Sequence, residues 1–145
     1  MQRLAGKRVY IDSNVFIFFG ENHPLFAGPI ESVFERASAG SLFLVTSELT
    51  LAEVLVLPMK NSDESRVSQY IEALTPRAYF DVIPVHRDIL LAAARVRAAH
   101  RIKLPDALHV ATAMAASCDV FLSEDQGIRG PQNLDLVRVS ELQQA

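Results

Sequence analysis

Short apolar runs alternate with longer helix-like segments along the whole chain, and this alternation constrains the possible folds most strongly. Five runs have the length and composition of buried strands, and five longer segments have the residue pattern of helices. Such alternation predicts a three-layer α/β/α fold around a mainly parallel sheet. Because we find no repeat, low-complexity tract or linker, we expect residues 1–145 to form a single domain.

Proline and glycine set the boundaries of these elements. Gly40 and Pro58 are predicted to end helices, Pro105 suits the first turn of one, and Pro84 favours an edge position for its strand. The predicted strands are residues 8–11, 42–45, 79–85, 120–122 and 134–139, and the predicted helices are residues 30–39, 49–57, 63–74, 87–100 and 107–117.

The composition is that of an ordinary soluble protein, with 50% hydrophobic and 21% charged residues. A formal net charge of −3 provides no broad basic field, so charge alone does not predict tight non-specific binding to nucleic acid. The single cysteine, Cys118, excludes an internal disulfide and fits a reducing compartment. Asp12 and Asn14 interrupt the first apolar stretch too early for a secretory signal, and no run approaches the roughly 18 apolar residues of a membrane helix. We therefore expect a cytoplasmic protein without membrane contact.

Two aspartates lie at or just beyond the ends of predicted strands. Asp12 ends the run 8–11, and Asp125 comes shortly after the run 120–122. In open parallel sheets, ligand sites lie beyond the carboxyl ends of the strands, where the strand order reverses. Both residues also have a structural alternative, Asp12 as a helix N-cap and Asp125 as a turn residue before Gly127.

Two further acids lie on predicted helices. Glu53 is the only charged residue between Glu48 and Lys60, in a helix that we expect to be mostly buried. A buried carboxylate needs a cation, hydrogen-bond donors or water around it. The alternative is that Glu53 occupies an exposed position on the helix. Asp106 begins the last helix, where it could simply complement the helix dipole. His109 lies one turn further on the same face, as a packed neutral side chain or as a ligand.

Together these four acids have the chemistry of a site for a hard divalent cation. Magnesium takes oxygen ligands, keeps several waters, and usually needs only one or two direct carboxylates. The remaining acids could hold metal-bound waters or activate one as a nucleophile. One or two such ions would let an acidic site hydrolyse an anionic phosphodiester without a cysteine or histidine nucleophile.

The chain resembles the PIN-domain family, and within it the VapC-type bacterial toxins, over residues 8–139. Four motifs in order carry the resemblance. Each motif alone is weak, but their order and spacing are specific. The motifs are Val9-Tyr10-Ile11-Asp12-Ser13-Asn14-Val15, Ser47-Glu48-Leu49-Thr50-Leu51-Ala52-Glu53-Val54, Leu104-Pro105-Asp106-Ala107-Leu108-His109-Val110-Ala111-Thr112-Ala113 and Asp119-Val120-Phe121-Leu122-Ser123-Glu124-Asp125.

The resemblance implies an endoribonuclease that needs Mg²⁺, for which Mn²⁺ substitutes, acting as the toxin of a toxin–antitoxin pair. It implies an RNA substrate, a small antitoxin protein as partner, and a homodimer. The family's acidic positions fall on Asp12, Glu53, Asp106 and Asp125, with Asp12 and Asp106 as the expected direct metal ligands. Asn14 and Ser123 match polar positions that orient these acids.

The last motif departs from the family pattern. Ser123-Glu124-Asp125 stands where the family often has Thr-Asn-Asp, so Glu124 adds a neighbouring carboxylate. We expect Asp125 to face the site, because Ser123 and Asp125 share a side of an extended chain.

Basic and aromatic residues are candidates for contact with RNA, and each has a structural alternative. The basic candidates would otherwise be solvated cations at a helix end or in a loop, and we expect Arg97 and Arg101 to share a helix face. The aromatic candidates would otherwise pack in the core. The basic residues are Arg97, Arg101, Lys103 and Arg129, and the aromatic ones are Phe16, Phe18 and Phe19.

Three other functions remain open. A phosphotransferase resembling haloacid dehalogenases would use a strand-terminal aspartate, but it needs a second aspartate at the position of Asn14. A non-catalytic PIN-like scaffold could bind RNA or protein, although the intact set of four acids argues against this. A stand-alone PIN nuclease in RNA processing would share the chemistry without the toxin role.

Overall fold

The computed structural model describes residues 2–144 and has a five-stranded sheet in which every neighbouring pair is parallel. The order across the sheet is β3-β2-β1-β4-β5. This confirms the predicted fold class and the edge position of the strand that precedes Pro84. The strands are β1 (Arg8–Ile11), β2 (Phe43–Ser47), β3 (Phe80–Ile83), β4 (Val120–Leu122) and β5 (Asp135–Val137).

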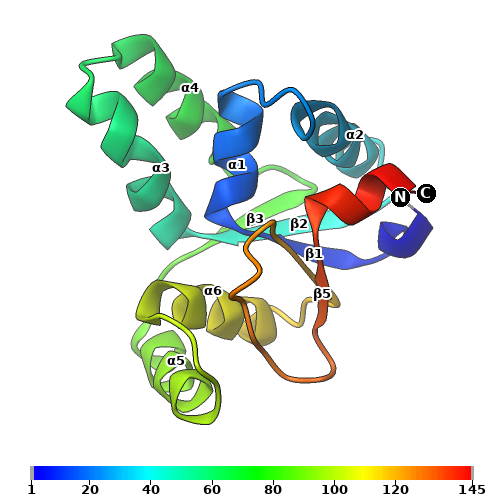
Figure 1. Ribbon diagram of the computed structural model, residues 1–145, viewed down its shortest axis with the longest axis vertical. Coiled ribbons are helices and arrows are strands. Elements are labelled where there is room, and N and C mark those ends of the chain that lie inside the picture. The colour runs from blue at the N-terminus through cyan, green and yellow to red at the C-terminus, as the bar shows by residue number, and fades with distance from the viewer. Residues whose placement is uncertain (1, 145) are drawn as a thin grey trace.

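Helices cover both faces of this sheet (Figure 1). The α helices are α1 (Ser13–Gly20), α2 (Ala27–Ser38), α3 (Glu48–Lys60), α4 (Glu64–Ala73), α5 (Arg87–Ala99) and α6 (Leu104–Ala115), and short 3-10 helices span Gln2–Leu4 (η1) and Val139–Gln144 (η2). None of the helices in the described part of the chain combines the length and hydrophobicity that crossing a bilayer requires.

The alternation of side chains along the strands produces two separate cores. Val9 and Ile11 of β1 belong to the core under α1, α2, α3 and α4, whereas Tyr10 points into the core under α5 and α6. All three are fully buried. A central parallel strand covered on both faces is expected to be apolar throughout, and β1 is.

The strand order places a topological switch between β1 and β4. From β1 the chain adds β2 and β3 on one side and then returns to add β4 and β5 on the other. The register pairs Ile11 with Leu122, so the residues that follow these two leave the sheet side by side. Asp12 and Ser123 are therefore neighbours at the carboxyl edge, where parallel sheets carry their sites.

Helix α1 was not predicted. Its sequence continues the apolar run of β1 without helical periodicity, so only the cap shows where the strand stops: the Asp12 carboxylate accepts a hydrogen bond from the Ser13 N–H. Phe16 is buried as expected for packing, whereas Phe19 remains 39% exposed.

Two predicted details of helices α3 and α5 are wrong. Pro58 does not end α3, which continues to Lys60, because a proline in the last turn removes only its own N–H, and the Asn61 N–H still reaches the Leu57 carbonyl. Helix α5 ends at Ala99, so Arg101 lies in the following loop and shares no helix face with Arg97.

Helix α3 is also more exposed than predicted. Val56, Leu57 and Met59 each expose more than half of their surface, while Val54 and Leu55 face the core. One face of the helix therefore presents apolar side chains to solvent, which matters for partner binding.

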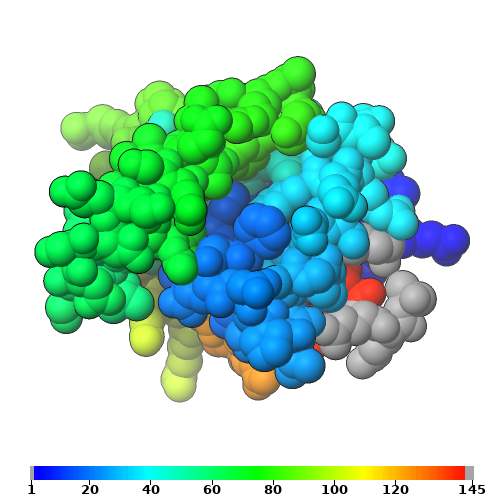
Figure 2. Space-filling model, turned by 90° about the horizontal axis from the view of Figure 1, so that it is seen from above, coloured from blue at the N-terminus to red at the C-terminus, as the bar shows by residue number. Residues whose placement is uncertain are grey.

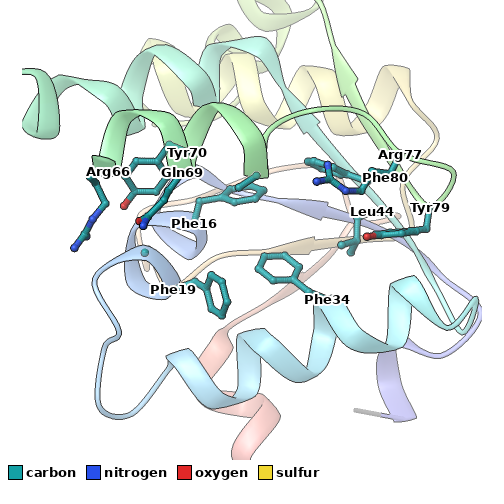
Figure 3. A pocket seen from close by; sticks show the side chains of 12 residues that line it. Phe16, Phe19, Phe34, Leu44, Arg66, Gln69, Tyr70, Arg77, Tyr79 and Phe80 are labelled. Atoms are coloured by element: carbon teal, nitrogen blue, oxygen red, sulfur yellow. The ribbon is translucent and has the colours of Figure 1, made fainter. Parts of the chain in front are cut away.

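An aromatic cavity of about 460 Å³ opens on the same side of the sheet, between α1, α2, α4 and the β2–β3 edge. Figure 2 looks onto this face, where a hollow separates α4 (green) from α2 (blue to cyan). The rings of Phe16, Phe19 and Phe34 line it, and Arg66 and Arg77 lie at its two ends (Figure 3). Tyr70 closes against α1 so tightly that a Cβ on Gly20 would lie 2.4 Å from the tyrosine hydroxyl.

Candidate active site

Asp12 is held in one orientation by its neighbours. It is 3% exposed; its Oδ1 accepts a hydrogen bond from the Ser13 N–H at 2.8 Å, and its Oδ2 accepts one from the Ser123 hydroxyl at 2.7 Å. Burial raises the pKa of Asp12, whereas the charge of His109 and the bonds from Ser123 and Ser13 lower it; the net pKa is above its ordinary value. The carboxylate is thus fixed, but it lacks full compensation for its charge.

Asn14 connects the two strand ends. Its Nδ2 donates to Asp12 Oδ2 at 3.2 Å and to Ser123 Oγ at 2.9 Å, and its Oδ1 accepts from the Glu124 N–H at 3.3 Å. The first turn of α1 is thereby tied to the residues after β4. Both Asn14 and Ser123 contact Asp12 directly.

Of the two acids after β4, Glu124 points away from the site. Its Oε2 accepts a hydrogen bond from the Ser140 N–H at 3.0 Å, so the carboxylate contacts η2. Asp125 is exposed, and its Oδ1 accepts the Gly127 N–H at 2.8 Å, as in the turn that was its structural alternative. Its backbone N–H donates at 3.0 Å to the Ser123 hydroxyl, which is bound to Asp12, and its negative charge contributes to the raised pKa of Asp106.

His109 bridges the two helical layers at the centre of the site. It is buried, its Nδ1 lies 2.6 Å from the Tyr10 hydroxyl, and its Nε2 lies 2.5 Å from Glu53 Oε1 and 3.7 Å from Asp12 Oδ1. Because a carboxylate only accepts, Nε2 carries a proton in this bond. Burial lowers the pKa of His109, but the bond to Glu53 and the charges of Asp12, Glu53 and Asp106 outweigh it, and the pKa is raised.

These contacts identify the hydrogen-bond partner of the Glu53 carboxylate, which has no charged neighbour within its own helix face. Its side chain is 32% exposed, so it is neither free in solvent nor fully buried. Its partner is a histidine from the opposite helical layer, and no residue of α3 takes this role. The partner of Glu53 could not be predicted, because the two residues are 56 positions apart.

The pKa of Asp106 is raised by burial and by neighbouring negative charges. Burial raises its pKa to about 6, with further contributions from the charges of Asp12, Asp125 and Glu53, while His109 lowers it. Its carboxylate accepts no hydrogen bond from any described residue. An acid that is uncompensated by donors and surrounded by like charges has the electrostatic character of a cation ligand.

The donor set is compatible with a hard divalent cation. All four acids supply oxygen, and Asp12 and Asp106 are sufficient if waters complete the shell, as magnesium prefers. Among the described residues no three His, Cys, Asp or Glu side chains are arranged to hold one ion together. A site of this kind would therefore rest on one or two direct carboxylates and would draw in the others through water.

The basic candidates are less closely gathered. Lys103 immediately precedes α6, and Arg97 donates to the Ile102 carbonyl at 3.4 Å, which holds the loop before Asp106. Arg101 is exposed in that loop. Arg129 lies across the site in the β4–β5 connection, where its guanidinium donates to the Gln126 and Ile128 carbonyls, each at 2.8 Å.

Comparison with known protein families gives one match that covers most of the chain. The model of the PIN domain family matches residues 9–132, which include the four candidate acids and all six α helices. No curated protein matches the sequence significantly.

Solved structures with the same fold include bacterial proteins of low sequence identity. A toxin–antitoxin complex from Klebsiella pneumoniae is 21% identical, with 87% of this chain and 94% of that chain covered and a TM-score of 0.64. VapBC2 from Rickettsia felis, bound to a DNA fragment from its promoter, is 15% identical, with 90% and 98% covered and a TM-score of 0.69. VapC20 from Mycobacterium tuberculosis, a toxin that cleaves the sarcin-ricin loop, is 16% identical, with 83% and 92% covered and a TM-score of 0.65. The match of the family model over most of the chain, on a fold with acids gathered at its switch point, shows that the chain belongs to the PIN domain family.

Proposed function

We propose that this protein is a magnesium-dependent endoribonuclease and the toxin of a toxin–antitoxin pair. The observation that carries the nuclease proposal is the set of contacts that joins acids from separate parts of the chain: His109 Nε2 lies 2.5 Å from Glu53 Oε1 and 3.7 Å from Asp12 Oδ1, and the Ser123 hydroxyl donates to Asp12 and accepts the Asp125 N–H. The charges of Asp12, Asp125 and Glu53 also raise the pKa of Asp106. Membership of the PIN domain family supports phosphodiester hydrolysis as the use of these acids.

Asp12 and Asp106 would hold Mg²⁺, and Glu53 and Asp125 would act through the surrounding waters. A bound ion would activate water and stabilise the charge that develops on the phosphate. The chain's own contribution is orientation: Ser123 and Asn14 fix the Asp12 carboxylate, and His109 fixes Glu53. His109 is fully enclosed, so we assign it a positioning role and no direct contact with RNA.

Metal-dependent cleavage is the direct test of this function. We expect the purified protein to cut single-stranded RNA in millimolar Mg²⁺ or Mn²⁺, and a chelator to abolish the cleavage completely. Added Mg²⁺ should restore it, because the acids remain in place without the ion. Cleavage that persists in chelator would contradict a metal site, whereas stable folding with neither RNA cleavage nor Mn²⁺ binding in calorimetry would leave a non-catalytic scaffold.

A protein partner is proposed from the apolar surface above the site. The aromatic cavity lies next to a second hollow of about 250 Å³ between α1, α3 and α4, and Arg66 and Tyr70 line both. Glu53 lines the second hollow, so the two form a path from the aromatic cavity to the candidate active site. An antitoxin segment with apolar and basic residues would fit this path, and a basic side chain could replace the metal's charge among the acids.

The toxin role is tested in cells and by copurification. We expect expression of the protein alone to arrest growth, and coexpression of a short product from the neighbouring reading frame to relieve the arrest and copurify with it. Asp12→Asn should bind that product but cause no arrest. If the wild-type protein is harmless and no neighbouring product binds it, a stand-alone nuclease remains.

We also propose a homodimer, supported by apolar side chains outside the path. Leu90 and Leu91 on α5 are about half exposed, as are Leu104 and Met114 on the adjoining α6. A symmetric dimer would bury these exposed apolar side chains against the same surface of a second copy of the chain. Light scattering at several concentrations would report the mass directly.

A further inference from the structure

A small hollow at the carboxyl ends of β4 and β5 adjoins the candidate active site. Its volume is about 240 Å³, and Ser123 and Asp125 form the wall that it shares with the acids. Arg129 and Arg138 also line the hollow. Arg138 was not a candidate in the sequence, because it follows a strand with no motif around it.

Strand register explains why Arg138 faces this hollow. Phe121 of β4 pairs with Leu136 of β5, and both line it. Two residues further along each strand the side chains return to the same face, which brings Ser123 and Arg138 together. The Ser123 N–H donates to the Val137 carbonyl at 3.0 Å, so the pairing continues to this point.

The two arginines carry charge that no carboxylate of the described residues neutralises by an ion pair. Glu141 also lines the hollow, but its Oε2 is bound by Arg3 at 2.6 Å and its Oε1 accepts the Arg138 N–H at 3.2 Å. Arg129 is held by two backbone carbonyls, which fix its position without removing its charge. The hollow therefore presents two guanidinium groups beside a negatively charged site.

We propose that this hollow binds the RNA phosphate next to the one being cut, with Arg138 and Arg129 as its ligands. The inference rests on the proposed ribonuclease function and specifies how the substrate strand lies. A strand with its scissile phosphate at Asp12 and Asp106 would place a neighbouring phosphate towards β5 if it runs past Ser123. Guanidinium forks bind phosphate oxygens in pairs, and a site of net negative charge needs such cations to accept a polyanion.

Salt dependence of cleavage tests the subsite without knowledge of the natural RNA. The probe is a fluorescent, mixed-sequence single-stranded RNA oligonucleotide, with kcat and KM measured over a range of KCl concentrations. Arg138→Ala should raise KM by about tenfold at low salt and leave kcat almost unchanged, since it removes a charged hydrogen bond of binding. The plot of log kcat/KM against log salt should become shallower by about 0.7, the value for one phosphate contact on a single strand.

Arg36→Ala is the matched control. Arg36 is an exposed arginine in the last turn of α2, which leads to the amino end of β2 and so lies at the opposite edge of the sheet. It should leave KM and the salt slope unchanged. Both variants should have the Tm of the wild-type protein, because both side chains are exposed.

A neutral phosphate analogue locates the contact. Once the cut bond in the oligonucleotide is mapped, a methylphosphonate at an adjacent linkage should cost the wild-type protein about tenfold in kcat/KM and cost Arg138→Ala almost nothing more. Equal sensitivity to salt and to the methylphosphonate in both proteins would overturn the subsite while the ribonuclease function stands. Loss of binding to a copurifying protein, with RNA kinetics unchanged, would instead assign the hollow to an acidic peptide. No cleavage by the wild-type protein would overturn both proposals.

Discussion

Asp12→Asn should reduce RNA cleavage by at least a hundredfold and leave the fold intact. The substitution keeps the size of the side chain and its Oδ1 contact with the Ser13 N–H, so the cap of α1 survives. It removes the negative charge of the most buried of the four acids, where we expect the loss of a metal ligand to weaken metal binding most. Single-turnover cleavage in excess Mg²⁺ measures the effect, and circular dichroism confirms the fold.

Asp119→Asn is the matched control for this loss. Asp119 precedes β4 at the opposite edge of the sheet, where its carboxylate accepts the Arg8 N–H at 2.9 Å, and an asparagine can still accept that bond. Its cleavage rate should equal that of the wild-type protein. If Asp12→Asn retains more than roughly a tenth of the wild-type rate, a barrier change below about 1.4 kcal/mol, Asp12 is no metal ligand.

Asp106→Asn should make the metal-free protein more stable while it removes activity. Without metal the folded state bears the repulsion among the acids, and the unfolded chain largely escapes it. Because Asp106 is partly exposed, we expect a gain of about 1 kcal/mol, or roughly 2–4 °C in Tm. Millimolar Mg²⁺ should then stabilise the wild-type protein, whose folded site binds it, and stabilise the variant less.

The gain in stability should depend on pH with a defined sign. The folded-state pKa of Asp106, about 6, lies above that of the unfolded chain, so ionisation destabilises the folded protein as pH rises through about 6. The advantage of asparagine should therefore be full near pH 7 and vanish below about pH 4, where aspartic acid is protonated in both states. Asp88→Asn, which removes an acid from the first turn of α5, is the control and should give no gain. Equal melting of Asp106→Asn and wild type, with equal shifts in Mg²⁺, would reduce Asp106 to a helix-end acid.

The layered fold was predictable because the three central strands, β1, β2 and β4, are mostly buried and largely apolar. Residues 120–122 were predicted with the bounds that β4 has. Helix α1 was missed for a physical reason: Val15, Phe16, Ile17, Phe18 and Phe19 bury or pack on nearly every side, so no 3.6-residue pattern exists to be recognised. In such a segment tertiary packing decides between strand and helix.

The sequence indicates which acids could form the candidate site, but it does not indicate which residues contact them. Asp12 and Asp125 follow strands, and parallel-sheet topology alone predicts that they share an edge. The role of His109 depends on a bond to Glu53 across two helical layers, which no local spacing encodes. Arg138 likewise faces the hollow only because β4 and β5 pair in one register. Long-range distances, unlike local patterns, had to come from the structure.

The four acids are carried by elements that differ in how deeply they are buried, and the hydrogen bond between His109 and Glu53 joins two of these elements. Asp12 and Asp125 follow strands of the central sheet, and Asp106 begins a helix whose next residues are almost all buried. Glu53 instead lies on α3, which buries Val54 and Leu55 but exposes much of its outer face and packs against α4, a helix with only Tyr70 buried along its length. Segments with few buried contacts open at a smaller free-energy cost than the core. A local opening of α3 and α4 would withdraw Glu53 alone, leaving the remaining three acids assembled on the stable part of the fold.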